Sequence, residues 1–280
     1  MRVLLVVNPH ARRGRVLGDD VRRRLALHGV ETVETASSPQ GLDAIVVAGG
    51  DGTFARAIGR GLTLGLPMGL VPLGTFNDLA RTLDIPADID GACATIAQRR
   101  TRAIDVARVN SAYYVSEASI GVSSRLTRLQ KTRDKQRFGL LAVLASALAA
   151  VKYLQPFHAE VAYEDARVNL RTVQLTIANS NHFGGVITVE GAAVDDGWLD
   201  LYSVEIDGPR SVLALMSAVL AGRPRTAQNV RTIRSAAFSV STRRPRAIVA
   251  DGEPAGKTPA RFELIRGALR VFAPDGAPSD

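Results

Sequence analysis

The loop Gly49-Gly50-Asp51-Gly52-Thr53 follows a short apolar run at 43–48, and a helical pattern begins immediately after it. Glycine lets a phosphate approach the backbone closely, and the N–H groups at a helix start present the positive end of the helix dipole. The carboxylate of Asp51 would repel a bound phosphate unless a cation such as Mg²⁺ bridges the two. The loop therefore predicts a site for a magnesium-complexed phosphate, with a hairpin or helix-cap turn as the alternative.

A second glycine-containing loop, Pro72-Leu73-Gly74-Thr75-Phe76-Asn77-Asp78, comes one helix and one strand later in the chain. Neighbouring parallel strands would bring both loops to the same edge of a sheet, where α/β folds bind their ligands. Thr75 by itself could be a helix cap or a ligand contact, and its pairing with the first loop favours contact.

Two further segments carry charged side chains that could act on a phosphate. The first apolar run, 3–7, ends in Asn8-Pro9-His10-Ala11-Arg12-Arg13-Gly14, and arginine matches phosphate oxygens in a bidentate way. Late in the chain, Asp251-Gly252-Glu253-Pro254 offers carboxylates that could take a proton from an attacking hydroxyl. A solvated basic turn and an exposed acidic turn are the alternatives.

The composition indicates an ordinary globular protein. With 280 residues and 46% hydrophobic content, the chain can bury two compact cores. Its single cysteine, Cys93, cannot form an internal disulfide, so a reducing, cytoplasmic compartment is expected. The longest uncharged apolar stretch, 138–151, is shorter than the ~18 residues of a membrane span, and we therefore expect a soluble or peripheral protein.

Hydrophobic periodicity divides the chain into two halves. Strand-like runs at 3–7, 44–48 and 68–71 alternate with helical patterns at 15–28, 53–64 and 75–83, which predicts parallel βαβ units. From about residue 103 the runs alternate in an antiparallel manner, at 103–109, 113–116, 158–163, 168–178, 198–206, 237–241 and 247–250. Two helical insertions are expected, at 122–154 and 209–221.

Taken together, Asn-Pro after the first strand, GGDGT, PLGT-x-Asn-Asp and the late Asp-Gly-Glu-Pro resemble the diacylglycerol-kinase-type lipid kinases. That family includes bacterial diacylglycerol and phosphatidylglycerol kinases and the sphingosine and ceramide kinases. The resemblance implies a three-layer α/β nucleotide-binding domain, similar to NAD kinases, at 1–105 and an antiparallel β-sandwich lipid-substrate domain at 106–265. The last strand, within 266–280, would return to the first domain, and ATP and the lipid hydroxyl would meet in the cleft.

The resemblance also implies roles for individual residues. The nucleotide would be bound by Asn8, Pro9, Ala11, Arg12, Ser37 or Ser38, Gly49, Gly50, Asp51, Gly52, Thr53 and Thr75. Arg13 would join Asp51 and Asp78 in an ionic network. Asp251 would be the general base and Glu253 would support it or the metal, although the sphingosine-kinase branch suggests Asp51 as the base.

By the same resemblance, the Asp196 carboxylate and the carbonyls of Ala193 and Trp198 would hold a structural Mg²⁺. A plain turn is the alternative, because two aspartates before a glycine are ordinary turn chemistry.

The chain departs from the family pattern at two places. Ala55 and Arg56 follow GGDGT-Phe54 where the family usually has Asn-Glu, so a polar pair near the nucleotide is missing. In addition, Val186 stands in place of a third glycine after Gly184-Gly185, and Glu190 or Gly191 in place of a proline.

The predicted activity is transfer of the ATP γ-phosphoryl group, with Mg²⁺, to a lipid hydroxyl, diacylglycerol first, giving phosphatidic acid. A kinase of a soluble hydroxyl similar to NAD kinase and a non-catalytic nucleotide-binding module are the alternatives. The net charge of +8 and the basic run at 125–137 suit an anionic membrane surface, here the inner face of the membrane, or simply a solvated helix. With 5% aromatic residues and no RNA-binding signature, nucleic acid is not expected as a partner. A homodimer is left open.

Overall fold

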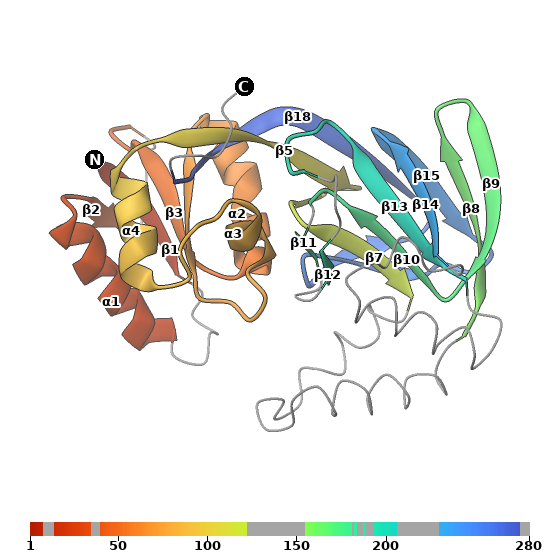
Figure 1. Cartoon of the computed structure of the whole chain (residues 1–280), viewed down its shortest axis with the longest axis horizontal. Coiled ribbons are helices and arrows are strands. Elements are labelled where there is room, and N and C mark those ends of the chain that lie inside the picture. Colours follow the sequence, from red (N-terminus) through yellow and green to blue (C-terminus); the bar gives the residue numbers. More distant parts are fainter. Residues whose placement is uncertain are drawn as a thin grey trace.

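Two long strands, β5 (Thr101–Val109) and β18 (Ala260–Phe272), run antiparallel through both halves of the protein and join them (Figure 1). The computed structural model describes residues 1–7, 14–34, 40–121, 155–180, 182–183, 187–188, 193–205 and 230–274. Because Val271 near the end of β18 pairs in parallel with Met68 of the N-terminal sheet, one sheet is continuous across both halves.

The N-terminal half is a parallel sheet in the order β2-β1-β3-β4. Its strands are β1 (Arg2–Val7), β2 (Glu31–Val33), β3 (Ala44–Gly49) and β4 (Met68–Pro72), and its helices are α1 (Gly14–Leu27), α2 (Asp51–Leu64), α3 (Asp78–Thr82) and α4 (Ile89–Ala97). Right-handed crossovers that leave the sheet centre in opposite directions place α1 and α2 on opposite faces. In the sheet, Met68 contacts α2 and Gly69 contacts α4, so the layers are helix, sheet and helix.

Every residue of β3 and β4 is buried, as expected for central parallel strands covered by helices. On α2, Phe54, Ala57, Ile58 and Gly61 form the buried side that packs against the sheet. The carboxyl ends of β3 and β4 lie next to each other, because Gly49 pairs with Pro72. The two glycine loops therefore start from adjacent points of one sheet edge.

The C-terminal half is antiparallel. One sheet has the order β14-β13-β10-β7-β16-β17, and the strands β15, β8 and β9 extend the other beyond β18. A core that includes Phe238, Phe262, Leu175 and Leu201 lies in this half. The bounds are β6 (Ala112–Tyr114), β7 (Glu117–Gly121), β8 (Phe157–Tyr163), β9 (Ala166–Thr172), β10 (Gln174–Ala178), β11 (His182–Phe183), β12 (Ile187–Thr188), β13 (Leu199–Val204), β14 (Val230–Ser235), β15 (Ala237–Thr242), β16 (Ala247–Ala250) and β17 (Glu253–Lys257).

The predicted fold class, an α/β domain followed by an antiparallel β-sandwich, is confirmed. One predicted strand is divided in the structure, and another ends earlier than predicted. The run 168–178 becomes β9 and β10, which belong to different sheets, and the amide of Val173 between them donates to the Val204 carbonyl. The run 113–116 ends at β6, and a bend at Val115 and Ser116 leads into β7, a strand that periodicity did not identify.

The predicted helix at 75–83 is shorter than expected, since α3 begins only at Asp78. Asn77 has φ 51°, in the left-handed region, so the residues before α3 cannot continue a helix. The predicted insertions at 122–154 and 209–221, with the basic run at 125–137, lie outside the described residues. In the described part of the chain, none of the helices has the length and apolar character needed to span a bilayer.

Candidate functional site

The GGDGT loop joins the end of β3 to the first turn of α2. Gly50 is the N-cap of α2, in an extended conformation, and no side chain caps the helix there. The Thr53 side chain is buried against Gly49, so the backbone amides at the helix start are the groups this loop can offer to a ligand. Such amides bind phosphate oxygens readily.

The two glycine loops contact each other backbone to backbone. A Cβ atom built on Gly50 would lie 2.9 Å from the Gly74 Cα, and one built on Gly74 would lie 2.5 Å from the Gly50 Cα. Both positions therefore require glycine. The contact holds the predicted phosphate loops together, with Thr75 exposed beside them.

Asp51 fastens the same two loops. Its carboxylate accepts hydrogen bonds from the backbone amides of Asp78 and Leu79, both at 3.1 Å, at the start of α3. Burial raises the Asp51 pKa, the two amides lower it, and the charge of Asp78 raises it. Asp78 itself is buried and pairs with Arg81. The structure thus brings Asp51 and Asp78 together, as predicted for the ionic network, whereas its third member, Arg13, lies outside the described residues.

The turn between β16 and β17 meets the GGDGT loop from the C-terminal half. A Cβ atom on Gly52 would lie 2.8 Å from the Asp251 carbonyl oxygen and 3.2 Å from Oε1 of Glu253. The predicted phosphate loop therefore contacts Asp251 and Glu253, which lie about 200 positions later in the sequence.

Both carboxylate oxygens of Asp251 are engaged by backbone amides. Oδ2 accepts from Val115 at 2.8 Å, and Oδ1 accepts from Ser116 at 3.1 Å and from Glu117 at 3.0 Å. Burial raises the Asp251 pKa to about 8, against the lowering effect of these amides and with a further rise from the charge of Asp51. Asp251 therefore fixes the bend between β6 and β7.

Glu253 is more accessible and forms an ion pair with Arg56 of α2. Their side chains are 44% and 53% exposed. Arg56 belongs to the first departure from the family pattern, and here it links α2 to the Asp251 turn across the two halves. Ala55, the other residue of that departure, is buried in the N-terminal core.

Glu117 is a site residue that the sequence analysis missed. Its amide donates to Asp251, and its carbonyl accepts from the Asp251 amide. Burial raises the Glu117 pKa to about 7, and the charge of Asp78 raises it further. No local motif marks this residue, because its surroundings come from three distant segments.

A raised carboxyl pKa makes folding pH-dependent. Between pH 4.5 and about 7 the folded protein retains the Glu117 proton and the unfolded chain does not, so the free energy of unfolding falls as pH rises. We expect Glu117→Gln to remove part of this fall, up to about 3 kcal/mol. Denaturant unfolding of the wild type and of Glu117→Gln at pH 5 and pH 8 measures this change in the free energy of unfolding. An equal fall in both proteins would contradict the prediction.

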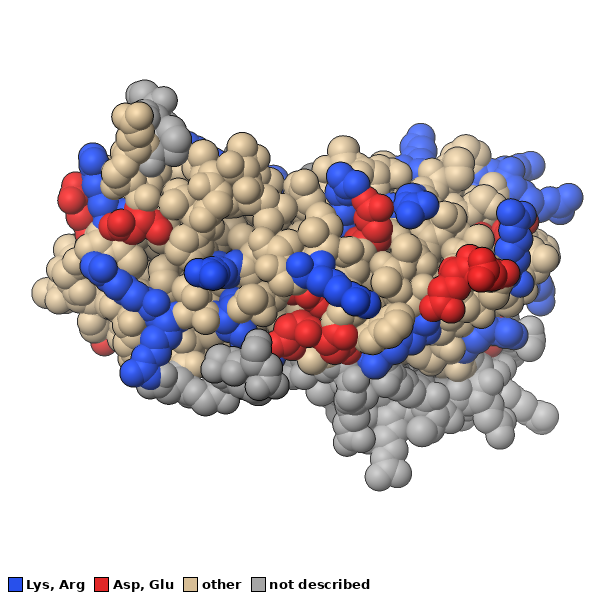
Figure 2. All heavy atoms as spheres, turned by 90° about the horizontal axis from the view of Figure 1, so that it is seen from above, with Lys and Arg blue, Asp and Glu red and all other residues tan. Residues whose placement is uncertain are grey.

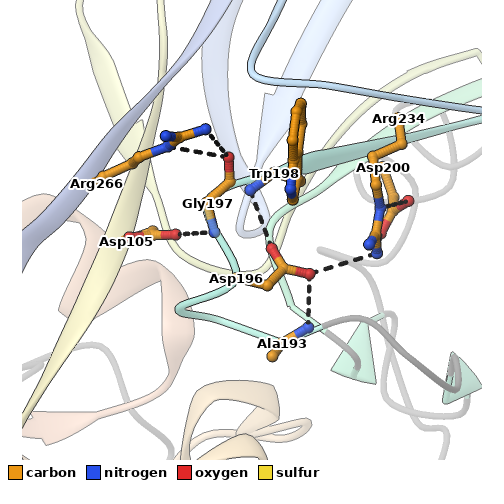
Figure 3. A network of polar contacts seen from close by, with 8 residues as sticks. All are labelled: Asp105, Ala193, Asp196, Gly197, Trp198, Asp200, Arg234 and Arg266. Carbon is orange, nitrogen blue, oxygen red and sulfur yellow. Dashed lines mark hydrogen bonds and ion pairs between the residues drawn. The ribbon is translucent and has the colours of Figure 1, made fainter. Parts of the chain in front are cut away.

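The predicted metal residues form a hydrogen-bonded turn (Figure 3). The Asp196 carboxylate accepts from the amides of Ala193 at 3.3 Å and Trp198 at 3.0 Å, and Arg234 lies 3.4 Å from its Oδ2. Arg234 also binds Asp200 through two nitrogens, at 3.1 and 2.9 Å. Two backbone amides and the Arg234 guanidinium therefore already engage the Asp196 carboxylate. The arrangement does not fit a structural Mg²⁺.

We therefore expect unfolding of the wild-type protein without nucleotide to be the same in EDTA and in millimolar Mg²⁺. Arg234→Met should cost about 2–4 kcal/mol, because it leaves the buried Asp200 carboxylate without its cation. Arg231→Met is the matched control on the same strand, since its pair with Glu205 is more exposed and should be worth less than about 1 kcal/mol. A wild-type midpoint that drops in EDTA would contradict the expectation.

Asp105 is a second residue that the sequence analysis missed. Its buried carboxylate accepts from the amide of Gly197 at 2.8 Å (Figure 3) and from the amide of Gly267 at 2.7 Å. Because Asp105 lies on β5 and Gly267 on β18, it fastens the two connecting strands to the Asp196 turn.

Several predicted positions lie outside the described residues. They are Asn8, Pro9, Ala11, Arg12 and Ser37 of the nucleotide set, together with the 184–186 and 190–191 departures. Their roles stay predictions.

Two family descriptions match this chain. Residues 2–109 match the diacylglycerol kinase catalytic domain, and residues 116–273 match the YegS C-terminal NAD kinase beta sandwich-like domain. The chain belongs to the diacylglycerol-kinase-type family. The two matched segments meet near the middle of the chain, where β5 and β6 give way to β7.

Three relatives align with most of the length of this kinase. A probable lipid kinase YegS-like of Stenotrophomonas maltophilia is 30% identical over 252 residues, 85% of this chain and 81% of its own length. A diacylglycerol kinase of Staphylococcus saprophyticus is 26% identical over 88% of this chain and 82% of its own length. An uncharacterized Synechocystis protein is 27% identical, and the kinase spans 58% of its length.

The fold is also that of solved relatives. A diacylglycerol kinase from Bacillus anthracis superposes with a TM-score of 0.76 over 99% of this chain and 98% of its own, at 21% identity.

Proposed function

We propose that this kinase transfers the γ-phosphoryl group of ATP to a lipid hydroxyl, with diacylglycerol as the first acceptor to test and phosphatidic acid as the product. The observation that carries the proposal is the contact of the GGDGT loop with the Asp251-Gly252-Glu253 turn at Gly52. Phosphoryl transfer requires a phosphate-binding loop and a proton acceptor on opposite sides of one reaction centre. The names of the relatives support a lipid acceptor.

The phosphates of ATP would lie at the helix start formed by Gly50, Asp51 and Gly52, beside Thr75. ATP would bring Mg²⁺ as part of the substrate. Burial raises the pKa values of Asp51 and Asp251, and a neighbouring carboxylate raises each further, Asp78 for Asp51 and Asp51 for Asp251. A hard divalent cation supported by carboxylate oxygens fits there.

We assign the general base to Glu253 and a positioning role to Asp251, the reverse of the expectation from the sequence. Both Asp251 oxygens already accept hydrogen bonds from backbone amides, which hold this carboxyl group in the bend at 115–117. Glu253 has the more accessible carboxylate, and Arg56 orients it. Arg56 stands where the family pattern has a polar residue, and its contact in this chain is with Glu253.

A lipid acceptor lies in a membrane, so we also propose that the protein attaches peripherally to the cytoplasmic face of an anionic bilayer.

The activity is tested with purified full-length protein, radiolabelled ATP and Mg²⁺. The acceptors are a mixed-micelle panel of diacylglycerol, phosphatidylglycerol, a sphingoid base and ceramide. We expect a phosphorylated lipid. Folded protein that labels none of them, or that labels NAD instead, would overturn the proposal.

A further inference from the structure

A basic cavity of about 520 Å³ lies at the end of the β-sandwich, away from the GGDGT loop. We call it the arginine pocket, and its described lining residues are Phe157, His158, Thr242, Arg243, Arg244 and Arg246. None of these is acidic. Figure 2 shows other Lys and Arg side chains gathered at the end of the molecule that carries β8 and β9, with a smaller acidic group among them.

The turn that bears the arginines is held firmly in place. The Arg246 amide donates to Oγ1 of Thr258 at 2.9 Å, and the Arg246 carbonyl accepts from the Thr258 amide at 2.9 Å. The Thr242 hydroxyl donates to the Arg244 carbonyl at 2.8 Å. The Arg246 guanidinium stacks 4.0 Å above the Phe157 ring, a cation–π contact that orients it. Arg243 and Arg244 are left exposed at the tip.

Neighbouring strands add positive charge to this end. Arg171 pairs with His158 across β8 and β9, and Lys257 pairs with Ala247 across β16 and β17. Both side chains are exposed. Glu160, the nearest acid along β8, lies 3.5 Å from Arg167. The balance around the pocket is therefore strongly positive.

The arrangement suits an extended anionic surface better than one small anion. Its two outermost arginines are exposed, so a single small anion would be held there only by screened contacts. Many phosphates in one plane allow each arginine its own bidentate contact, at about 1 kcal/mol per Lys or Arg near the surface. Phe157 is buried and cannot stack on a nucleic-acid base.

We propose that the arginine pocket, with Arg243 and Arg244 at its tip, is the surface by which this protein docks on an anionic phospholipid bilayer. The choice of a bilayer as the partner rests on the proposed lipid-kinase function. Docking here would hold the sandwich against the membrane while the cleft between the halves takes the lipid.

The test is co-sedimentation of the full chain with vesicles of phosphatidylcholine alone or mixed with phosphatidylglycerol, without ATP. We expect binding to the mixed vesicles only, weakened by salt, and a loss of about 10- to 30-fold in Arg243→Gln/Arg244→Gln. Arg167→Gln/Arg261→Gln is the matched control, because it removes the same charge toward the other end of β8 and β15. This control should bind like the wild type.

Equal binding by the two double variants, or wild-type binding by the pocket variant, would overturn the proposal. So would tighter binding of duplex DNA than of anionic vesicles at the same salt, lost in the pocket variant. In neutral detergent micelles the pocket variant should phosphorylate lipid at the wild-type rate. If vesicle binding behaves as expected but no lipid is ever phosphorylated, the docking surface stands and the proposed function fails.

Discussion

Glu253→Gln is expected to lower kcat by about 10²- to 10⁴-fold, the usual contribution of a positioned general base. The amide keeps the size of the side chain and can still accept from Arg56, so the ion-pair geometry of the turn is largely retained. It cannot take a proton. We expect the KM for ATP and the thermal unfolding midpoint to stay near the wild-type values, measured by steady-state kinetics and by calorimetry.

Asp251→Asn distinguishes the positioning role proposed for Asp251 from the general-base role proposed for Glu253. The Asn side chain turns an NH₂ group toward the amides of Val115, Ser116 or Glu117, which leaves at least one of them without its acceptor. The cost is about 1–3 kcal/mol of stability, and the lost activity should accompany a lower midpoint. If Asp251→Asn instead lost only kcat, with full stability, while Glu253→Gln stayed active, the base would be Asp251.

Gly52→Ala is expected to cost about 100-fold in kcat/KM. A methyl group there would lie 2.8 Å from the Asp251 carbonyl oxygen, and a backbone atom cannot swing aside as a flexible side chain can. The GGDGT loop and the Asp251 turn must therefore separate, and misplacement of reacting groups by about 1 Å costs a factor of this size. Overpacking should also remove about 1–3 kcal/mol of stability.

Gly59→Ala is the matched control on the same helix. Its methyl group would lie 3.4 Å from the Tyr113 ring, which is ordinary contact. The substitution should be neutral or stabilise by up to about 1 kcal/mol, because alanine favours a helix interior over glycine. Activity of Gly52→Ala within about twofold of the Gly59→Ala value would show that the contact between the halves does not matter for turnover.

The sequence by itself determined the fold class and the position of both glycine loops. Apolar runs such as 44–48 and 68–71 are buried on both faces and followed by helical patterns, so local periodicity identifies them without tertiary information. Glycine and aspartate directly after such runs are typical of loops that bind a phosphate and its cation. Asp51 and Asp78 could be placed together for a related reason, because adjacent parallel strands end at one edge.

Only the tertiary structure decided which partners the carboxylates of Asp251 and Glu253 have. Asp251 and Glu253 are two positions apart in the sequence, yet amides from the bend at 115–117 engage the first, and Arg56 of α2 holds the second. Those partners are distant in the chain, and hydrogen bonding and burial depend on what surrounds a side chain. For the same reason the sequence did not point to Glu117 and Asp105, or to Arg234 beside Asp196, where the family resemblance had implied a metal ion.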